Sequence, residues 1–115
     1  MSFIRSNRVR NITGLTNAQE QRIRDFLQGA VYDWFKNHQN EWFSLRDLMG
    51  GANTNWTGTP MEELYEKHIK LRKTAPKAVK QAGIDGGHVL ARVMELDRHR
   101  YDFRQGPRIK QYRRV

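Results

Sequence analysis

A helix-start signal followed by a long apolar stripe is the feature that most constrains the fold of this chain. Thr16 and Gln19 have the spacing of a capping box, in which each side chain bonds the backbone N–H of the other residue. Apolar residues then recur in the i, i+3, i+4 rhythm that puts them on one helix face: Ile23, Phe26, Leu27, Ala30, Val31, Trp34 and Phe35. The pattern predicts a helix that ends within residues 37–40 and buries one face.

Two more helix starts follow. Ser44 and Asp47 form a weaker cap on a short helix that ends before residues 50–58, a loop rich in Gly, Asn and Thr. Thr59-Pro60-Met61-Glu62 is stronger, because Thr59 can cap, Pro60 suits the first helical position and Glu62 completes the box. This helix should extend to about residue 73. His68 lies on its apolar face, where we expect a hydrogen-bonded core histidine.

Residues 74–98 predict two helices joined by a tight turn. Thr74 should cap the first, with Pro76 near its start and Gly83 as the glycine that ends it. Asp85 should then cap a second, amphipathic helix. A short helix, a glycine turn and a longer amphipathic helix form the plan of a helix-turn-helix.

The second helix of this plan would present a polar outer face to a DNA groove. At 100° per residue, that face carries His88, Ala91, Arg92, Glu95 and His99. Ala91 would permit close approach, and Arg92 could make a bidentate contact to guanine. Glu95 is unfavourable for this predicted DNA-reading face unless it accepts a hydrogen bond from a cytosine amino group or lies at the groove edge.

The last segment, residues 98–115, predicts a basic β-hairpin. Two runs of β-favouring residues flank Gly106-Pro107. Alternation places Tyr101 and Phe103 on one face and Arg100, Asp102 and Arg104 on the other, while the second run alternates less cleanly, with Tyr112 on the Lys110 face.

The net charge of +9 is unevenly distributed along the chain. Residues 1–15 contribute +3 and residues 98–115 contribute +6, while residues 16–97 hold eleven basic and eleven acidic residues. Excess charge segregated in this way makes a positive surface that attracts a polyanion.

On these elements, residues 60–115 resemble a winged helix-turn-helix domain, in which the second helix reads the major groove and the hairpin, the wing, touches the backbone or minor groove. The fold class we expect is mainly α with a small C-terminal β-hairpin, a winged-helix-like single domain. A basic arm, residues 1–15, would precede one helical domain, residues 16–115, with the helix-turn-helix at about 74–98 and the wing at 98–115. A second register makes residues 42–45 the first wing strand, 45–49 the second helix and 60–72 the recognition helix.

The expected function is DNA binding, as a transcriptional regulator or nucleoprotein component, with duplex DNA favoured over RNA. A single winged domain binds weakly, which would favour a homodimer joined through the first helix. The alternative is a protein-interaction module or a binder of single-stranded nucleic acid that stacks bases on Tyr101, Phe103 and Tyr112. The candidate contacts are Arg5, Arg8, Arg10, Lys77, Lys80, His88, Arg92, Arg98, Arg100, Arg104, Arg108, Lys110, Arg113 and Arg114.

Enzymatic and membrane functions have little support in the sequence. No Cys is present, no Asp or Glu is followed two places later by Lys, and the four histidines include no H-x-x-x-H pair. No phosphate-binding loop motif occurs. No apolar run approaches the roughly 20 residues of a membrane span, and the first ten residues lack a signal-peptide core. We therefore expect a cytoplasmic, nucleic-acid-associated, non-enzymatic protein with no cofactor, no metal and no membrane partner.

Overall fold

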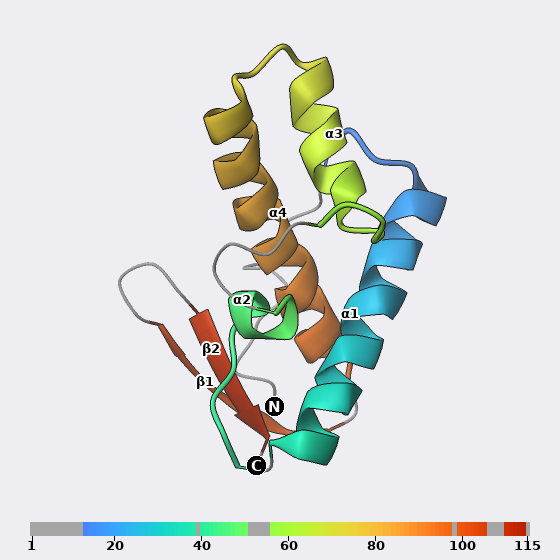
Figure 1. The fold of residues 1–115 in the computed structure, drawn as a ribbon. Helices are drawn as coiled ribbons and strands as arrows, with labels where there is room; N and C mark the ends of the chain where they lie inside the picture. Colours follow the sequence, from blue (N-terminus) through green and yellow to red (C-terminus); the bar gives the residue numbers. More distant parts are fainter. Residues whose placement is uncertain (1–12, 39, 51–55, 98, 106–109, 115) are drawn as a thin grey trace.

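The chain forms four helices and a C-terminal antiparallel hairpin in the part that the computed structural model describes, residues 13–38, 40–50, 56–97, 99–105 and 110–114 (Figure 1). The elements are α1 (Asn17–Asn37), α2 (Leu45–Leu48), α3 (Glu62–Lys70), α4 (Ala75–Leu96), β1 (Tyr101–Gln105) and β2 (Lys110–Arg114). The predicted fold class, mainly helical with a small C-terminal hairpin, is confirmed in this respect. The predicted arm, residues 1–15, lies almost wholly outside the described residues.

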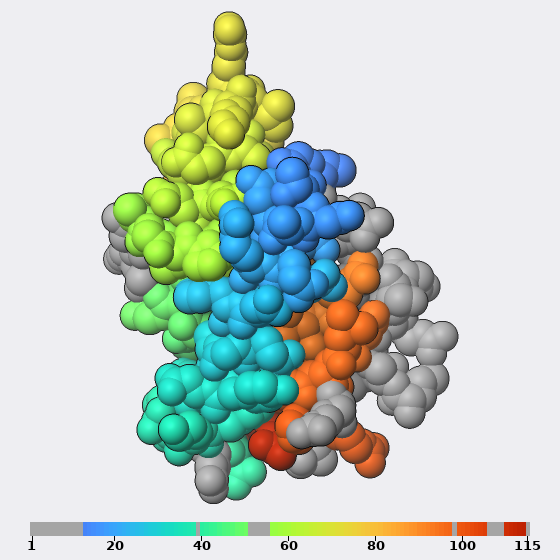
Figure 2. Space-filling view, turned by 90° about the vertical axis from the view of Figure 1, so that its right-hand side faces the viewer, coloured from blue at the N-terminus to red at the C-terminus, as the bar shows by residue number. Residues whose placement is uncertain are grey.

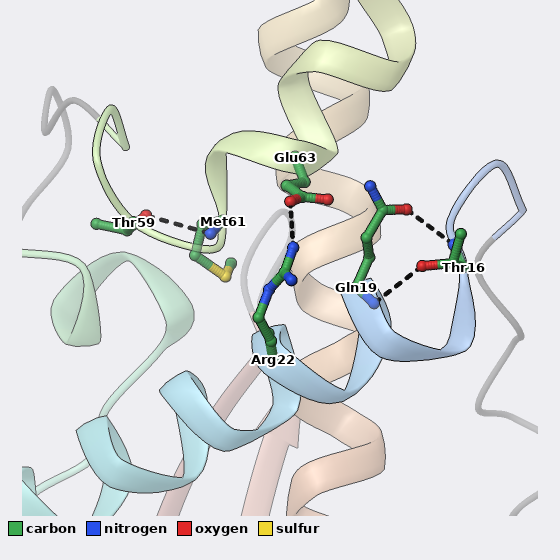
Figure 3. A network of polar contacts seen from close by, with 6 residues as sticks. All are labelled: Thr16, Gln19, Arg22, Thr59, Met61 and Glu63. Carbon is green, nitrogen blue, oxygen red and sulfur yellow. Dashed lines mark hydrogen bonds and ion pairs between the residues drawn. The ribbon is translucent and has the colours of Figure 1, made fainter.

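Helix α1 begins and packs as its sequence predicts. The Thr16 hydroxyl accepts from the Gln19 N–H at 3.1 Å, and the Gln19 side chain accepts from the Thr16 N–H at 2.8 Å (Figure 3). Its buried stripe consists of Ile23, Leu27, Val31 and Phe35. On its opposite side Arg22 reaches the carboxylate of Glu63 in α3, which ties the two helices together (Figure 3).

The start of α3 differs from the sequence prediction. Residues 59–61 form a turn, closed by a 3.0 Å bond from the Glu62 N–H to the Thr59 carbonyl, so Pro60 is not the first helical residue. The Thr59 hydroxyl accepts from the Met61 N–H at 3.2 Å (Figure 3). It also donates to the Trp56 carbonyl at 2.8 Å. This turn places Met61 in the core with no exposed surface, and that burial outweighs the local helix-start signal.

The predicted helix-turn-helix at residues 74–98 is wrong, because α4 is one continuous helix from Ala75 to Leu96. Gly83 is an interior helical residue. An i, i+4 stripe of small residues, Ala78, Ala82 and Gly86, is buried and continues into Val89 and Val93. Burying that stripe compensates for glycine's cost of about 1 kcal/mol in a helix interior. A Cβ on Gly86 would lie 2.8 Å from Leu45 Cδ2 and 3.2 Å from Met61 Cε, so glycine lets α2 approach α4 closely.

A polar network braces α3 against α4. His68 is buried, and its Nε2 lies 2.7 Å from the carboxylate of Asp85, the residue expected to cap a helix that does not begin there. Lys73 Nζ lies 2.7 Å from His68 Nδ1. Because a lysine ammonium only donates, Nδ1 accepts and Nε2 donates to Asp85. Lys67 also contacts Asp85 at 2.7 Å. The prediction that His68 is a hydrogen-bonded core histidine is confirmed.

The short segment between α1 and α2 pairs with β2 and so joins the hairpin to the helical body. Phe43 forms an antiparallel bridge with Tyr112, with both N–H···O distances at 2.8 Å. The pairing of residue 43 with the hairpin agrees with the first wing strand of the second register. Phe35, Phe43, Tyr101 and Tyr112 then meet in an aromatic cluster with ring centroids 5.6–6.0 Å apart. This cluster fixes the hairpin on the C-terminal end of α1.

Candidate nucleic-acid interface

The register of the hairpin sorts its side chains into an inner and an outer face. Phe103 pairs with Tyr112, and Tyr101 pairs with Arg114, so these positions share the inner face. Asp102 pairs with Arg113, and Arg104 pairs with Gln111, on the outer face. Tyr101 and Tyr112 are buried against the helices, whereas Asp102 and Arg104 are exposed. The outer face is therefore polar and carries two arginines.

The guanidinium groups of both arginines lie over the indole ring of Trp42. The Cζ atoms of Arg104 and Arg113 lie 4.3 Å and 4.7 Å from the centroid of the Trp42 ring. Arg104 Nε also donates to Gln111 at 2.7 Å, and Arg113 lies 3.5 Å from Asp102. Trp42 directly precedes the Phe43 bridge residue, so the bridge brings its indole to the outer face. We call Trp42, Arg104 and Arg113 the outer-face cluster.

The imperfect alternation of β2 has a structural cause. Lys110 and Arg114 share the parity of buried Tyr112, yet each lies at an end of the strand. Lys110 Nζ is 5.1 Å from the Phe103 ring, and Arg114 Cζ is 5.3 Å from the Phe35 ring. Both cations cover the apolar edge of the hairpin and keep their charge at the surface.

A buried carboxylate at the base of the hairpin positions β1. The side chain of Asp97, the C-cap of α4, has no exposed surface. It accepts from the Tyr101 hydroxyl at 2.7 Å, Gln28 Nε2 at 2.9 Å and the His99 N–H at 2.9 Å. Burial alone would raise the pKa of Asp97, but these hydrogen bonds outweigh it and hold the pKa below its ordinary value. Burial and the neighbouring Asp97 raise the pKa of Tyr101, so its phenol stays a donor.

The structure divides the remaining predicted contacts among several places. Arg100 is exposed just before β1, four residues before Arg104 of the outer-face cluster. Lys77 and Lys80 are exposed near the start of α4, at the far end of that helix from the hairpin (Figure 1). Several predicted contacts, together with the Gly106-Pro107 break expected between the strands, lie outside the described residues: Arg5, Arg8, Arg10, Arg98 and Arg108.

The groove-reading face predicted for α4 is wrong in part. Ala91, expected to permit close approach to DNA, is only 6% exposed and belongs to the core. His88 and Arg92 are half-buried, and His99 lies beyond the end of the helix, with its ring Nδ1 2.9 Å from Asp97. The outer face predicted for α4 is therefore reduced to three half-buried side chains, those of His88, Arg92 and Glu95. The second register, with residues 60–72 as recognition helix, also places Glu62, Glu63 and Glu66 on α3, which would repel phosphates.

The sequence interpretation missed Trp42 and Asp97. The bridge between Phe43 and Tyr112, residues 69 positions apart, brings Trp42 to the outer-face cluster. The signal available in the sequence was the aromatic pair Trp42-Phe43 in a segment that the second register treated as a strand. Nothing local distinguishes Asp97 from an exposed helix-capping residue.

Protein-family models, curated proteins and solved structures yield no match to this chain. Among the described helices, none combines the length and the apolar character that crossing a bilayer requires.

Proposed function

We propose that this protein binds nucleic acid, with duplex DNA as its partner, through the outer face of the C-terminal hairpin. The observation that carries the proposal is the outer-face cluster, in which one indole ring holds two guanidinium groups. Arginine forms paired hydrogen bonds to phosphate oxygens. A guanidinium that is already ordered loses less side-chain entropy on binding.

Charge supports the same conclusion. The segment 98–115, which contains the hairpin, has seven basic residues and one acidic residue. Asp102 is the one acid in it, and its 3.5 Å contact to Arg113 is exposed. Exposed ion pairs contribute about 0–1 kcal/mol. A phosphate can therefore replace Asp102 as the partner of Arg113 at little cost.

The proposed contacts are to the backbone rather than to base edges. Phosphate contacts position a protein on a duplex and carry no direct sequence information. Because Ala91, the neighbour of Arg92, is buried in the core, this proposal does not include base reading by α4. Binding should therefore show weak preference among duplex sequences.

Single-stranded nucleic acid is a less favoured partner. The stacking platform expected for it, Tyr101, Phe103 and Tyr112, faces inward: Tyr101 is 4% exposed and Tyr112 is 1% exposed. Trp42 is the one aromatic residue that the described part of the chain places on the outer face, and two arginines already lie over its ring. A competition between duplex and single strand of equal length separates the two partners, since a stacking protein prefers the single strand.

The test is the affinity of an Arg104→Ala, Arg113→Ala double variant for duplex DNA. We expect binding to weaken at least tenfold, equally for unrelated sequences. Arg24→Ala on α1 is the charge control, because Arg24 contacts Gln21 and Glu20 of its own helix. The proposal is wrong if the double variant binds as tightly as the Arg24 variant.

A further inference from the structure

A second concentration of positive charge lies at the opposite end of the molecule from the hairpin. The zero net charge of residues 16–97 conceals it, because residues 67–80 hold six lysines and arginines and no acid. This segment comprises the end of α3, the connection and the start of α4. In Figures 1 and 2, two views related by a 90° turn about the vertical axis, it forms the upper end, and β2 lies at the lower end.

Two of the six cations are engaged within the fold. Lys67 contacts Asp85 and the Thr13 carbonyl, both at 2.7 Å, and its side chain is only 10% exposed. Lys73 donates to His68. These two residues stiffen the connection between α3 and α4.

The other four cations are exposed, and no ion pair involves them within the described part of the chain. We call them the tip cations: Lys70, Arg72, Lys77 and Lys80. The acids nearest in sequence are Glu66 on α3 and Asp85, and Asp85 is already bound to Lys67 and His68. Glu66 lies one helical turn before Lys70 and can offset its charge, whereas the charges of Arg72, Lys77 and Lys80 are available to an external anion.

We propose that the tip cations form a second phosphate-binding surface, so that one molecule holds two separate segments of nucleic acid. The inference rests on the proposed function of the hairpin. The molecule measures 41 Å along its longest axis and 29 Å and 28 Å across. Tip and hairpin occupy the two ends of the elongated shape (Figure 1). A segment bound at the tip crosses the end of the molecule, away from the segment bound at the hairpin.

An anionic membrane is the competing partner, because two apolar side chains stand among the tip cations. Leu71 is 66% exposed and Val79 is 61% exposed. Two side chains offer little apolar area for insertion, whereas interfacial membrane helices present a whole apolar face. Four cations with two isolated apolar residues fit a phosphate backbone better, and nucleic acid is already the proposed partner of the other end.

The experiment measures whether the protein can hold two DNA duplexes at the same time. One duplex is fixed to beads, a second, fluorescent duplex of unrelated sequence is in solution, and protein is added in increasing amounts. The wild type should retain the fluorescent duplex at intermediate concentrations and release it when excess protein fills every site separately. A Lys77→Glu, Lys80→Glu variant should still bind the fixed duplex, within a few-fold of wild type, but retain at least tenfold less fluorescent duplex.

The matched control is Lys77→Arg, Lys80→Arg, which keeps the charge and should retain the fluorescent duplex. Thermal unfolding checks that the exposed substitutions leave the fold intact. If the wild type binds no single duplex, the function proposed for the hairpin fails. If it binds one duplex but retains no second, or if the Glu variant retains as much as wild type, the tip proposal fails. It also fails if the Glu variant loses only binding to vesicles of anionic phospholipid, which would make a membrane the partner.

Discussion

At the residue scale, the buried carboxylate of Asp97 helps to hold the start of β1 through its bonds to His99 and Tyr101. Hydrogen bonds to a charged acceptor contribute about 1.5–3 kcal/mol each, and an amide at this position could not accept from Tyr101, Gln28 and His99 in the same way. We expect Asp97→Asn to lower the free energy of unfolding at neutral pH by about 2–3 kcal/mol, as measured by urea denaturation.

The pKa of Asp97 gives this stabilisation a pH dependence. Its pKa in the folded protein lies below the ordinary value of 3.8, so the unfolded chain takes up the proton first as pH falls. The contribution is fully present above pH 3.8 and is lost as pH falls through the lower, folded pKa. Urea titrations should therefore show the gap between wild type and Asp97→Asn narrowing in acid. A gap that widens in acid would contradict the assigned hydrogen bonds.

Two buried tyrosines provide a matched pair of substitutions. Tyr101 donates to Asp97, whereas the Tyr112 hydroxyl has no hydrogen-bond partner among the described residues. Tyr101→Phe should cost about 1.5–3 kcal/mol, because a charged acceptor loses a donor. Tyr112→Phe should leave the stability unchanged or raise it, since it removes a buried hydroxyl. Equal losses for the two variants, in thermal or urea unfolding, would show that the hairpin is packed differently.

At the element scale, local sequence predicted the start of α1 but not the continuity of α4. The α1 start was predictable because Thr16, Gln19 and the apolar stripe lie within a few turns of one another. The sequence around Gly83 looks the same locally whether this glycine ends one helix or lies inside a longer one. The outcome depends on Gly86 contacting Leu45 and Met61, which are distant in sequence. The hairpin was predictable, but Trp42's place on it required the Phe43–Tyr112 bridge.

Alanine at the glycines of α4 tests its continuity. Gly83 has no atom within 4 Å of an added Cβ, so Gly83→Ala should raise the free energy of unfolding by up to about 1 kcal/mol. Gly86→Ala should be less stable than Gly83→Ala, because the added Cβ would lie 2.8 Å from Leu45 Cδ2 and 3.2 Å from Met61 Cε, so these side chains must move. If residue 83 were instead the left-handed end of a helix, Gly83→Ala would destabilise the protein. Urea unfolding of the two variants distinguishes these possibilities.

At the scale of the whole molecule, a core of helices separates two basic ends. The sequence predicted the charge of the C-terminal end by a direct count, but the sum over residues 16–97 hid the charge of the tip. The structure brings residues 67–80 together at one end and moves Lys77 and Lys80 away from the hairpin arginines with which the sequence had grouped them. A single basic surface is thereby replaced by two.

The most direct test of nucleic-acid binding through the hairpin is the salt dependence of the duplex-binding constant, measured for wild type and for the Arg104→Ala, Arg113→Ala variant. If about six phosphates are contacted, log K for the wild type should fall with log salt at a slope of about −5. Losing two phosphate contacts should make the slope of the variant shallower by about 2 and its binding weaker at low salt. A wild-type constant that does not change with salt, or a variant with the wild-type slope and affinity, would contradict the account.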